Sequence, residues 1–295
     1  MKTLKIIEKT KIWFSISLII MLIGLFCMIK NGLNYGIDFK GGTLVQINMK
    51  KDFDKQEVEK IISKYTKDYT TNTAINTANQ VQLEIRSNSL TDEQVGPMFN
   101  EIKEKYKLQD KDLVSQQRIG PSVGKELRQN ALLALLIANA AMLIYVAIRF
   151  EFKFALAAIL GLVHDIIITV SVYAILQIPI NSSFIAAILT IVGYSINDTI
   201  VVFDRIRENS KKMRRASDVE LADISITETM TRSINTVLTT LFTITAVFAF
   251  VPAVRDFATP LIVGIISGAY SSIFISSPLW VIFKTKGLKK ALVSK

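Results

Sequence analysis

Apolar residues gather in six long runs along the chain, and polar residues dominate the segments between them. A hydrocarbon core about 30 Å thick is crossed by roughly 20 helical residues, so an uncharged run of about 18 residues or more predicts a membrane span. The runs are residues 12–29, 131–148, 154–176, 183–203, 234–251 and 260–283, two of them, 154–176 and 183–203, with polar interruptions. This pattern predicts a membrane α-helical bundle with six transmembrane helices.

A polar stretch, residues 30–130, separates the first two runs and is long enough for a domain. Its periodicity predicts strands at 43–49, 70–75, 80–86 and 113–119 and helices at 54–69 and 91–106. Thr91 followed by Gln94 is typical of a helix capping box. The order strand, helix, strand, strand, helix, strand predicts an α+β ferredoxin-like domain between helices one and two.

The formal net charge of +10 is concentrated beside particular runs. Cytoplasmic segments carry an excess of Lys and Arg, so we expect both termini to be cytoplasmic. The basic excess then serves orientation and contact with anionic lipids, and nucleic acid is not an expected partner. The basic residues are Lys2, Lys5, Lys9, Lys11, Arg205, Arg207, Lys211, Lys212, Arg214, Arg215, Lys284, Lys286, Lys289 and Lys290.

These assignments divide the chain of 295 residues into five parts. The parts are a cytoplasmic N-terminus (1–11), an uncleaved first transmembrane helix (12–29), an extracytoplasmic α+β domain with linker (30–130), helices two to six with a cytoplasmic loop at 205–232 (131–283), and a basic cytoplasmic tail (284–295). Cys27 is the only cysteine, so an intrachain disulfide is impossible and a cysteine metal cluster is not expected. We see no phosphate-binding glycine loop on the cytoplasmic side, and we expect neither ATP nor another cofactor.

The fourth run contains polar residues where lipid is expected. Asn197 and Asp198 lie inside it, and Asp204 lies at its cytoplasmic end. An ionisable side chain at the centre of a membrane helix costs about 2.5 to 3.5 kcal/mol on insertion scales, so we expect a role inside the protein. Six residues at 1.5 Å each place Asp198 about 9 Å deeper than Asp204.

The fifth helix begins with Arg232, and Thr236 continues a polar stripe along it with Thr239, Thr240 and Thr243. Helices four and five meet at the cytoplasmic side, so Arg232 enters at a depth from which it can reach Asp198. A carboxylate opposite an arginine stays ionised, whereas one whose partner moves away tends to take up a proton. The residues alone leave open whether this pair is a proton switch or a permanent ion pair.

Two further features have both a functional and a structural interpretation. His164 and Asp165 lie near the middle of the third helix, and they are candidates for a proton relay or for hydrogen bonds between helices. Adjacent helical residues point about 100° apart, so the two do not suit one metal ion, and no metal site is predicted. On the sixth helix Gly264, Gly268 and Ser272 recur every four residues, which suits either a sliding contact or tight static packing.

Five segments in order along nearly the whole chain resemble the SecF family of protein-export membrane proteins, which is part of the resistance-nodulation-division superfamily. They are YGIDFKGGTLVQI, GLVHD, VGYSINDTIVVFDRIREN, TRSINTVLTT and GIISGAYSSIFISSPL. The resemblance implies one half of a twelve-helix assembly, with SecD as the other half on another polypeptide. It places the family's proton-linked acid at Asp198 and its arginine at Arg232. Asp38, Gly41 and Gly42 match the entry to the external domain, where glycines permit a tight turn.

The resemblance implies a proton-motive-force-dependent subunit that assists late steps of protein translocation at the SecYEG channel, with the external domain contacting the emerging polypeptide client. We do not expect an enzyme, since Asp198 and Asp165 lack the settings of intramembrane aspartyl proteases. Two alternatives remain. One is a passive assembly subunit, and the other is a proton-coupled exporter of the same superfamily, for which the compact external segment leaves little room.

Overall fold

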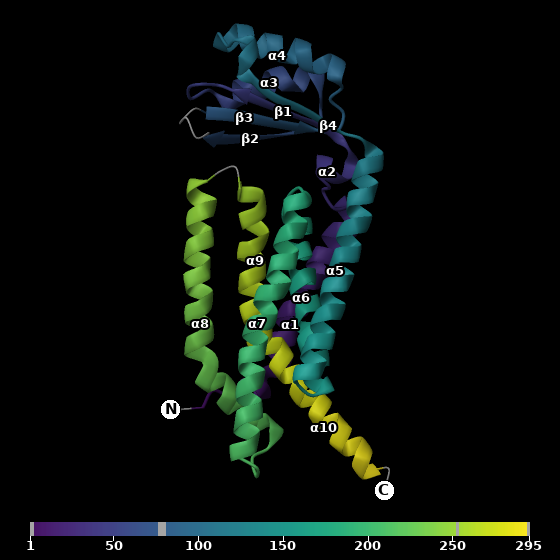
Figure 1. The fold of residues 1–295 in the computed structure, drawn as a ribbon, viewed down its shortest axis with the longest axis vertical. Helices are drawn as coiled ribbons and strands as arrows, with labels where there is room; N and C mark the ends of the chain where they lie inside the picture. The colour runs from purple at the N-terminus through teal and green to yellow at the C-terminus, as the bar shows by residue number, and fades with distance from the viewer. Residues whose placement is uncertain (1–2, 76–80, 252–253, 294–295) are drawn as a thin grey trace.

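A small α+β domain stands on one end of a bundle of long helices in the computed structural model, which describes residues 3–75, 81–251 and 254–293 (Figure 1). Residues 1–2 of the predicted N-terminus and 294–295 of the predicted basic tail lie outside these ranges. The N-terminal segment and α10 (Ser277–Val293) lie at the end opposite the external domain. Both described ends of the chain are therefore on one side of the bundle.

The external domain has the predicted order of elements and antiparallel sheet order β2-β3-β1-β4, which confirms the ferredoxin-like arrangement. Its elements are α2 (Ile37–Lys40), β1 (Gly42–Asn48), α3 (Lys55–Tyr65), β2 (Tyr69–Ile75), β3 (Val81–Ser87), α4 (Asp92–Tyr106) and β4 (Leu113–Ile119). Asp54 caps α3 by accepting a hydrogen bond from Gln56 N (2.9 Å), and the predicted capping box of Thr91 and Gln94 begins α4.

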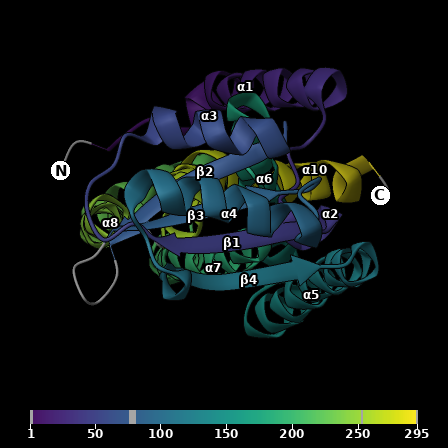
Figure 2. The same cartoon turned by 90° about the horizontal axis from the view of Figure 1, so that it is seen from above.

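Alternation along the strands gives the sheet two different faces. Val45 and Ile47 lie opposite Ile85 and Leu83, and these side chains are fully buried under α3 and α4. The residues between them point to the other face, which is polar. Figures 1 and 2 show that α3 and α4 cover the sheet on its outer side, so the polar face looks toward the membrane helices.

Six helices or helix pairs among the described residues are long and apolar enough to cross a membrane, as predicted. They are α1 (Thr10–Asn31), α5 (Pro121–Arg149), α6 (Phe152–Leu176), α7 (Ser182–Lys212), α8 (Asp218–Phe250), and α9 (Arg255–Ser271) with α10. The central layer is α6, α7 and α9, and α5 and α8 stand on its two sides (Figure 1).

Several details differ from the sequence prediction. The helix predicted at 54–69 ends at Tyr65, with Tyr69 already in β2, and the short helix α2 was not predicted. Residues 121–130, predicted as linker, are the first turns of α5. The segment 218–231, predicted as part of the cytoplasmic loop 205–232, is helical and continuous with the fifth span, because neither Gly nor Pro interrupts residues 218–250. The sixth span contains a π-helical segment, Ser272–Ser276, between α9 and α10.

Candidate functional site

Asp165 lies at the centre of the bundle, where three helices meet. It projects from the middle of α6 and is 0% exposed. Ser195 Oγ on α7 donates to its Oδ2 (2.6 Å), and on α9 Ser267 Oγ donates to Oδ1 (2.7 Å) and Ser271 Oγ to Oδ2 (2.8 Å). A buried carboxyl is tolerated when its oxygens are hydrogen-bonded. Asp165 therefore ties α6 to α7 and α9.

His164 extends the same network toward α1. Its Nδ1 lies 3.0 Å from Asp165 Oδ1, and its Nε2 lies 2.8 Å from Ser17 Oγ on α1. The structure thus shows the expected hydrogen bond to a neighbouring helix. Although adjacent helical side chains diverge, His164 and Asp165 bend close enough to contact each other. A relay role for either residue stays a prediction.

Asp198 is buried at the middle of α7, with 7% of its surface exposed. Ser233 Oγ on α8 donates to its Oδ1 (2.7 Å). Its Oδ2 is buried without a hydrogen-bond partner among the described residues. Ser272 lies beside this carboxyl and shares a hydrogen bond of 2.8 Å with Thr199. In contrast to Asp165, Asp198 has only part of its hydrogen-bonding capacity satisfied.

Arg232 does not pair with Asp198 in this structure, contrary to the geometric expectation. Ser233, the next residue, occupies the position that faces the carboxyl, and Arg232 is exposed. Adjacent residues on a helix are turned by about 100°, so Arg232 points elsewhere when Ser233 faces α7. No ion pair of Arg232 is found within the described ranges. A permanent ion pair with Asp198 is therefore absent from this conformation.

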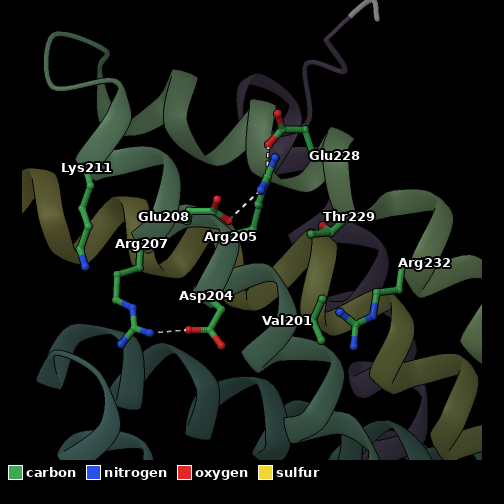
Figure 3. Close-up of a pocket in the computed structure, with 9 residues that line it drawn as sticks. All are labelled: Val201, Asp204, Arg205, Arg207, Glu208, Lys211, Glu228, Thr229 and Arg232. Atoms are coloured by element: carbon green, nitrogen blue, oxygen red, sulfur yellow. Dashed lines mark hydrogen bonds and ion pairs between the residues drawn. The ribbon is translucent and has the colours of Figure 1, made fainter.

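Arg232 instead lines a cleft of about 540 Å³ between α7 and α8 (Figure 3). Ion pairs hold five of the other charged residues of the cleft, Asp204, Arg205, Arg207, Glu208 and Glu228. Arg205 Nε lies 2.7 Å from Glu228 Oε2, and Arg205 Nη1 lies 2.7 Å from Glu208 Oε2. Asp204, one of the predicted pathway residues, pairs with Arg207 (2.8 Å). The cleft thus lies along the half of α7 that follows Asp198, from Val201 to Lys211, and Asp204 belongs to its charged lining.

Two other predicted pathway residues lie on the outer surface of this chain. Asn197 is exposed, although its neighbour Asp198 is buried. Thr236 is also exposed, and its hydroxyl donates to Arg232 O of its own helix (2.9 Å). Tyr194 Oη connects the two helices by donating to Thr240 Oγ1 (3.2 Å). The structure therefore brings neither Asn197 nor Thr236 into contact with Asp198.

The three small residues predicted for helix packing all face α7. A Cβ added at Gly264 would lie 2.1 Å from Ile191 Cδ1, and one at Gly268 would lie 3.0 Å from Ser195 Cβ. Ser272 reaches α7 through its hydrogen bond to Thr199. The absence of side chains at these positions allows α9 to approach α7 closely. Sliding of the two helices stays a prediction.

The segment predicted as a joint to the external domain is anchored to the membrane helices. Asp38 Oδ2 accepts a hydrogen bond from Ser182 N, at the first residue of α7 (2.7 Å). Gly41 has a φ of 83° and Gly42 a φ of 153°, which are conformations that other residues rarely adopt. These glycines permit the turn from α2 into β1. A hinge motion at this turn is untested.

Sequence reasoning missed the serines that contact the two carboxyls. Ser195, Ser233, Ser267 and Ser271 are unremarkable in a membrane helix by composition, although the four-residue spacing of the last two was a usable signal. Among the described residues, no three His, Cys, Asp or Glu side chains are grouped as metal ligands would be.

Comparison with known proteins gives consistent matches. Residues 98–286 match the family "Protein export membrane protein SecD/SecF, C-terminal", and residues 28–52 match the "SecD/SecF GG Motif". The chain is 41% identical to the protein translocase subunit SecF of Haemophilus influenzae, with 90% of this chain and 82% of that relative covered. It is 36% identical to the protein translocase subunit SecDF of Bacillus subtilis, with 96% of this chain and 38% of that relative covered.

A solved structure shows the same fold. The crystal structure of SecDF from Thermus, described as a translocon-associated membrane protein, matches with a TM-score of 0.81 and 33% identity. The match covers 96% of this chain and 39% of that one. The chain thus spans about two fifths of the length of that SecDF chain.

Proposed function

The chain belongs to the SecD/SecF family of protein-export membrane proteins, and from this premise we propose that it is a translocase subunit that couples the proton gradient to late steps of protein export. It is a multi-pass protein of the bacterial inner membrane. We place both termini and the charged cleft in the cytoplasm and the external domain outside, following the distribution of Lys and Arg. The proposal assigns the chain no catalysed reaction.

The observation that carries this proposal is the incomplete environment of Asp198. One carboxyl oxygen of Asp198 accepts a hydrogen bond from Ser233, and the other is buried without a partner in the described part of the chain. Arg232 is the residue that precedes Ser233 on α8. A carboxyl that lacks a charged partner tends to hold a proton, and one beside an arginine stays ionised. The present arrangement is thus suited to the proton-loaded state.

A rotation of α8 by about 100° would exchange Ser233 for Arg232 opposite Asp198. Little packing opposes such a rotation in the apolar window of α8, because only 6% of that window is buried in this chain. The first turns of α8, where Leu221, Ala222 and Ile226 are buried, would have to stay in place while the window turns. One charge that crosses the membrane potential releases about 2.3 kcal/mol per 100 mV, which is in the range of ordinary coupling energies. We therefore assign Asp198 and Arg232 to a proton switch, with the cleft as its cytoplasmic mouth.

Four partners follow from the proposal. The SecDF relatives contain a further portion outside the match, and we propose that this chain associates with SecD as the corresponding half. The polar residues exposed on α7 and α8 would lie in that interface, since lipid cannot satisfy them. We further propose that the external domain contacts the emerging polypeptide beside the SecYEG channel and that the basic cytoplasmic segments contact anionic lipids.

Export into inverted membrane vesicles, measured with ATP alone and with ATP plus a proton gradient, tests the proposal. We expect Asp198→Asn to assemble with SecD and to keep ATP-driven export, while it loses the gradient-dependent part. Asn keeps the hydrogen bond to Ser233 but cannot carry a proton. Glu220→Gln, an exposed acid at the start of α8, is the matched control and should behave as wild type.

Two outcomes would redirect the proposal. Wild-type gradient stimulation in Asp198→Asn would favour the passive assembly subunit. Proton-coupled efflux of small molecules by vesicles that show no stimulated protein export would favour the exporter.

A further inference from the structure

A single ion pair joins the external domain to a membrane helix among the described residues. Arg86 Nη1 on β3 lies 2.6 Å from Asp256 Oδ2, which is in the first turn of α9. Asn181 Nδ2, just before α7, donates to the same oxygen (3.0 Å). Arg86 points from the polar face of the sheet, the face that looks toward the membrane helices. The pair therefore bridges the gap between the two parts of the molecule.

Arg86 is held in this position by a partly buried environment. Its side chain is 25% exposed and that of Asp256 is 30% exposed. Burial alone would lower the pKa of Arg86, but the carboxylates of Glu84 and Asp256 outweigh burial and raise it. Arg86 thus keeps its charge, and a charge-assisted hydrogen bond of this kind is stronger than a neutral one.

The position of the pair in the fold matters as much as its strength. The covalent connections of the external domain, through α2 and α5, join the sheet at Gly42 and Ile119, which pair with each other. Arg86, opposite Leu44, lies close to that same end but on the neighbouring strand β3, above the start of α9. A domain attached at one end can pivot about that attachment. A second attachment at Arg86 fixes its tilt relative to α9.

The other end of α9 contacts the buried site. Ser267 and Ser271, about 16 and 22 Å along the helix from Asp256, donate to Asp165. The same helix packs on α7 through Gly264 and Gly268, close to the turn that carries Asp198. A single helix of 17 residues, with Pro260 inside it, therefore contacts both the carboxyl site and the external domain.

The α-helical hydrogen bonding of α9 ends at Ser271, next to this site. Residues Ser272–Ser276 are π-helical, and Ser277 Oγ donates to Ser272 O (2.8 Å). Short π segments interrupt the regular α-helical ladder and are common at functional sites and at kinks. The segment gives α9 a place to bend relative to α10, beside Thr199 and Asp198.

We propose that α9 transmits motion from the buried carboxyl site to the external domain, with the π segment as its pivot and the Arg86–Asp256 pair as its outer coupling. This inference rests on the proposed proton-coupled function. A shift of α7 and α9 at Asp198 and Asp165 displaces the outer end of α9. The Arg86–Asp256 pair then converts this displacement into a change in the tilt of the sheet.

The test is a charge exchange in the full membrane complex. Arg86→Glu and Asp256→Arg each place like charges together, whereas Arg86→Asp combined with Asp256→Arg restores an opposite pair. We expect each single variant to reduce gradient-dependent export at least threefold without changing ATP-driven export, and the double variant to recover at least half of the loss. Arg118→Glu is the matched control, because Arg118 is also an arginine of the sheet but pairs with Asp92 inside the external domain (2.9 Å).

A distance measurement separates this inference from the proposed function. Since Cys27 is the only cysteine, spin labels at Glu104→Cys and Leu176→Cys in a Cys27→Ser background report the tilt of the external domain. The single charge variants should broaden the distance distribution, and the double variant should narrow it again. A narrow distribution in Arg86→Glu, or single variants that export as wild type, would overturn the coupling role. Absence of gradient stimulation in the wild type would instead overturn the proposed function, while a broadened distribution in Arg86→Glu would still support the coupling contact.

Discussion

The external domain and the membrane helices differ in how completely each covers its own core. In the external domain, α3 and α4 close over the sheet, and the side chains between them are almost fully buried. In the membrane part, half of the apolar window of α7 is buried, but only 6% of the windows of α5 and α8. Lipid can cover apolar side chains. It cannot satisfy the polar groups that α8 also leaves uncovered.

The external domain therefore covers its own core, whereas the membrane part leaves polar groups of α8 uncovered by the other described helices. Polar residues recur along the exposed face of α8, and the structure offers them few partners from other helices. These residues are Arg232, Asn235, Thr236, Thr239 and Thr243. A surface of this kind in a membrane is explained by a second protein or by a water-filled interior. The external domain has no comparable deficit, and we expect it to fold by itself.

The largest expected effect concerns the uncovered face of α8. Thr236, Thr239 and Thr243 changed together to Leu should weaken co-purification with the second half at least tenfold, because three hydroxyl groups, which in this chain bond to carbonyls of α8 itself, are lost from the proposed interface. Affinity purification followed by native mass spectrometry measures the fraction of complex. The control changes Leu133, Leu136 and Ile137 on α5, which are similarly exposed, to Ala. Equal recovery of the complex from both variants would contradict an interface at α8.

A second prediction examines the external domain alone. Residues 36–120 should fold as a soluble α+β unit, and Ile62→Ala should lower its free energy of unfolding by about 3 kcal/mol, because Ile62 is fully buried. Urea unfolding followed by circular dichroism gives both results. Val114→Ala, at a residue that is 53% exposed, should change the free energy by less than about 0.5 kcal/mol. An unfolded fragment would show that the domain also needs the membrane helices.

The two parts also differ in how well the sequence predicts them. Strand alternation and helical periodicity identified the four strands and the two long helices of the sheet domain, because each of these elements buries one face and exposes the other. They did not identify the short helix α2. Length and hydropathy identified the membrane spans. They did not reveal that residues 218–250 form one helix, because the charged residues of its first turns mask its continuity.

The sequence predicted how far along α7 and α8 the residues of the candidate site lie, but not which face of each helix they occupy. Spacing along α7 and α8 placed Arg232 near the level of Asp198, yet Ser233 makes the contact. An error of one residue turns a helix by about 100°, and only packing against neighbouring helices fixes that angle. For the same reason the serines around Asp165 could not be assigned, since they come from two further helices.

A third prediction sharpens the contrast within the membrane part. Gly264→Ala should lower the stability of the whole chain in detergent by about 2 kcal/mol, because the new methyl group meets Ile191 in the packed layer between α9 and α7. Gly193→Ala, on the uncovered side of α7, adds a methyl group with no atom of another element within 4 Å. It should leave the melting temperature unchanged or raise it, since Ala favours a helix over Gly. Similar losses in both variants would mean that the two sides of α7 are equally packed.

The smallest expected effect concerns an ion pair inside the external domain. Asp112 is buried, pairs with Lys50 Nζ (2.5 Å) and accepts from Gln109 N (2.6 Å). Burial alone would raise its pKa, but the Lys50 ammonium and the backbone N–H outweigh burial, so the pKa lies below its ordinary value of 3.8. A carboxyl with a lowered folded-state pKa stabilises the fold above its unfolded pKa, and the stabilisation is lost as the pH falls through the folded pKa.

Asp112→Asn should therefore cost the 36–120 fragment about 1.5 kcal/mol at pH 7, and this difference from the wild type should shrink once the pH falls below about 4. Urea unfolding of both fragments between pH 7 and pH 2.5 measures it. A difference that stays constant with pH would mean that shape and neutral hydrogen bonds at Asp112, rather than its charge, stabilise this end of the sheet.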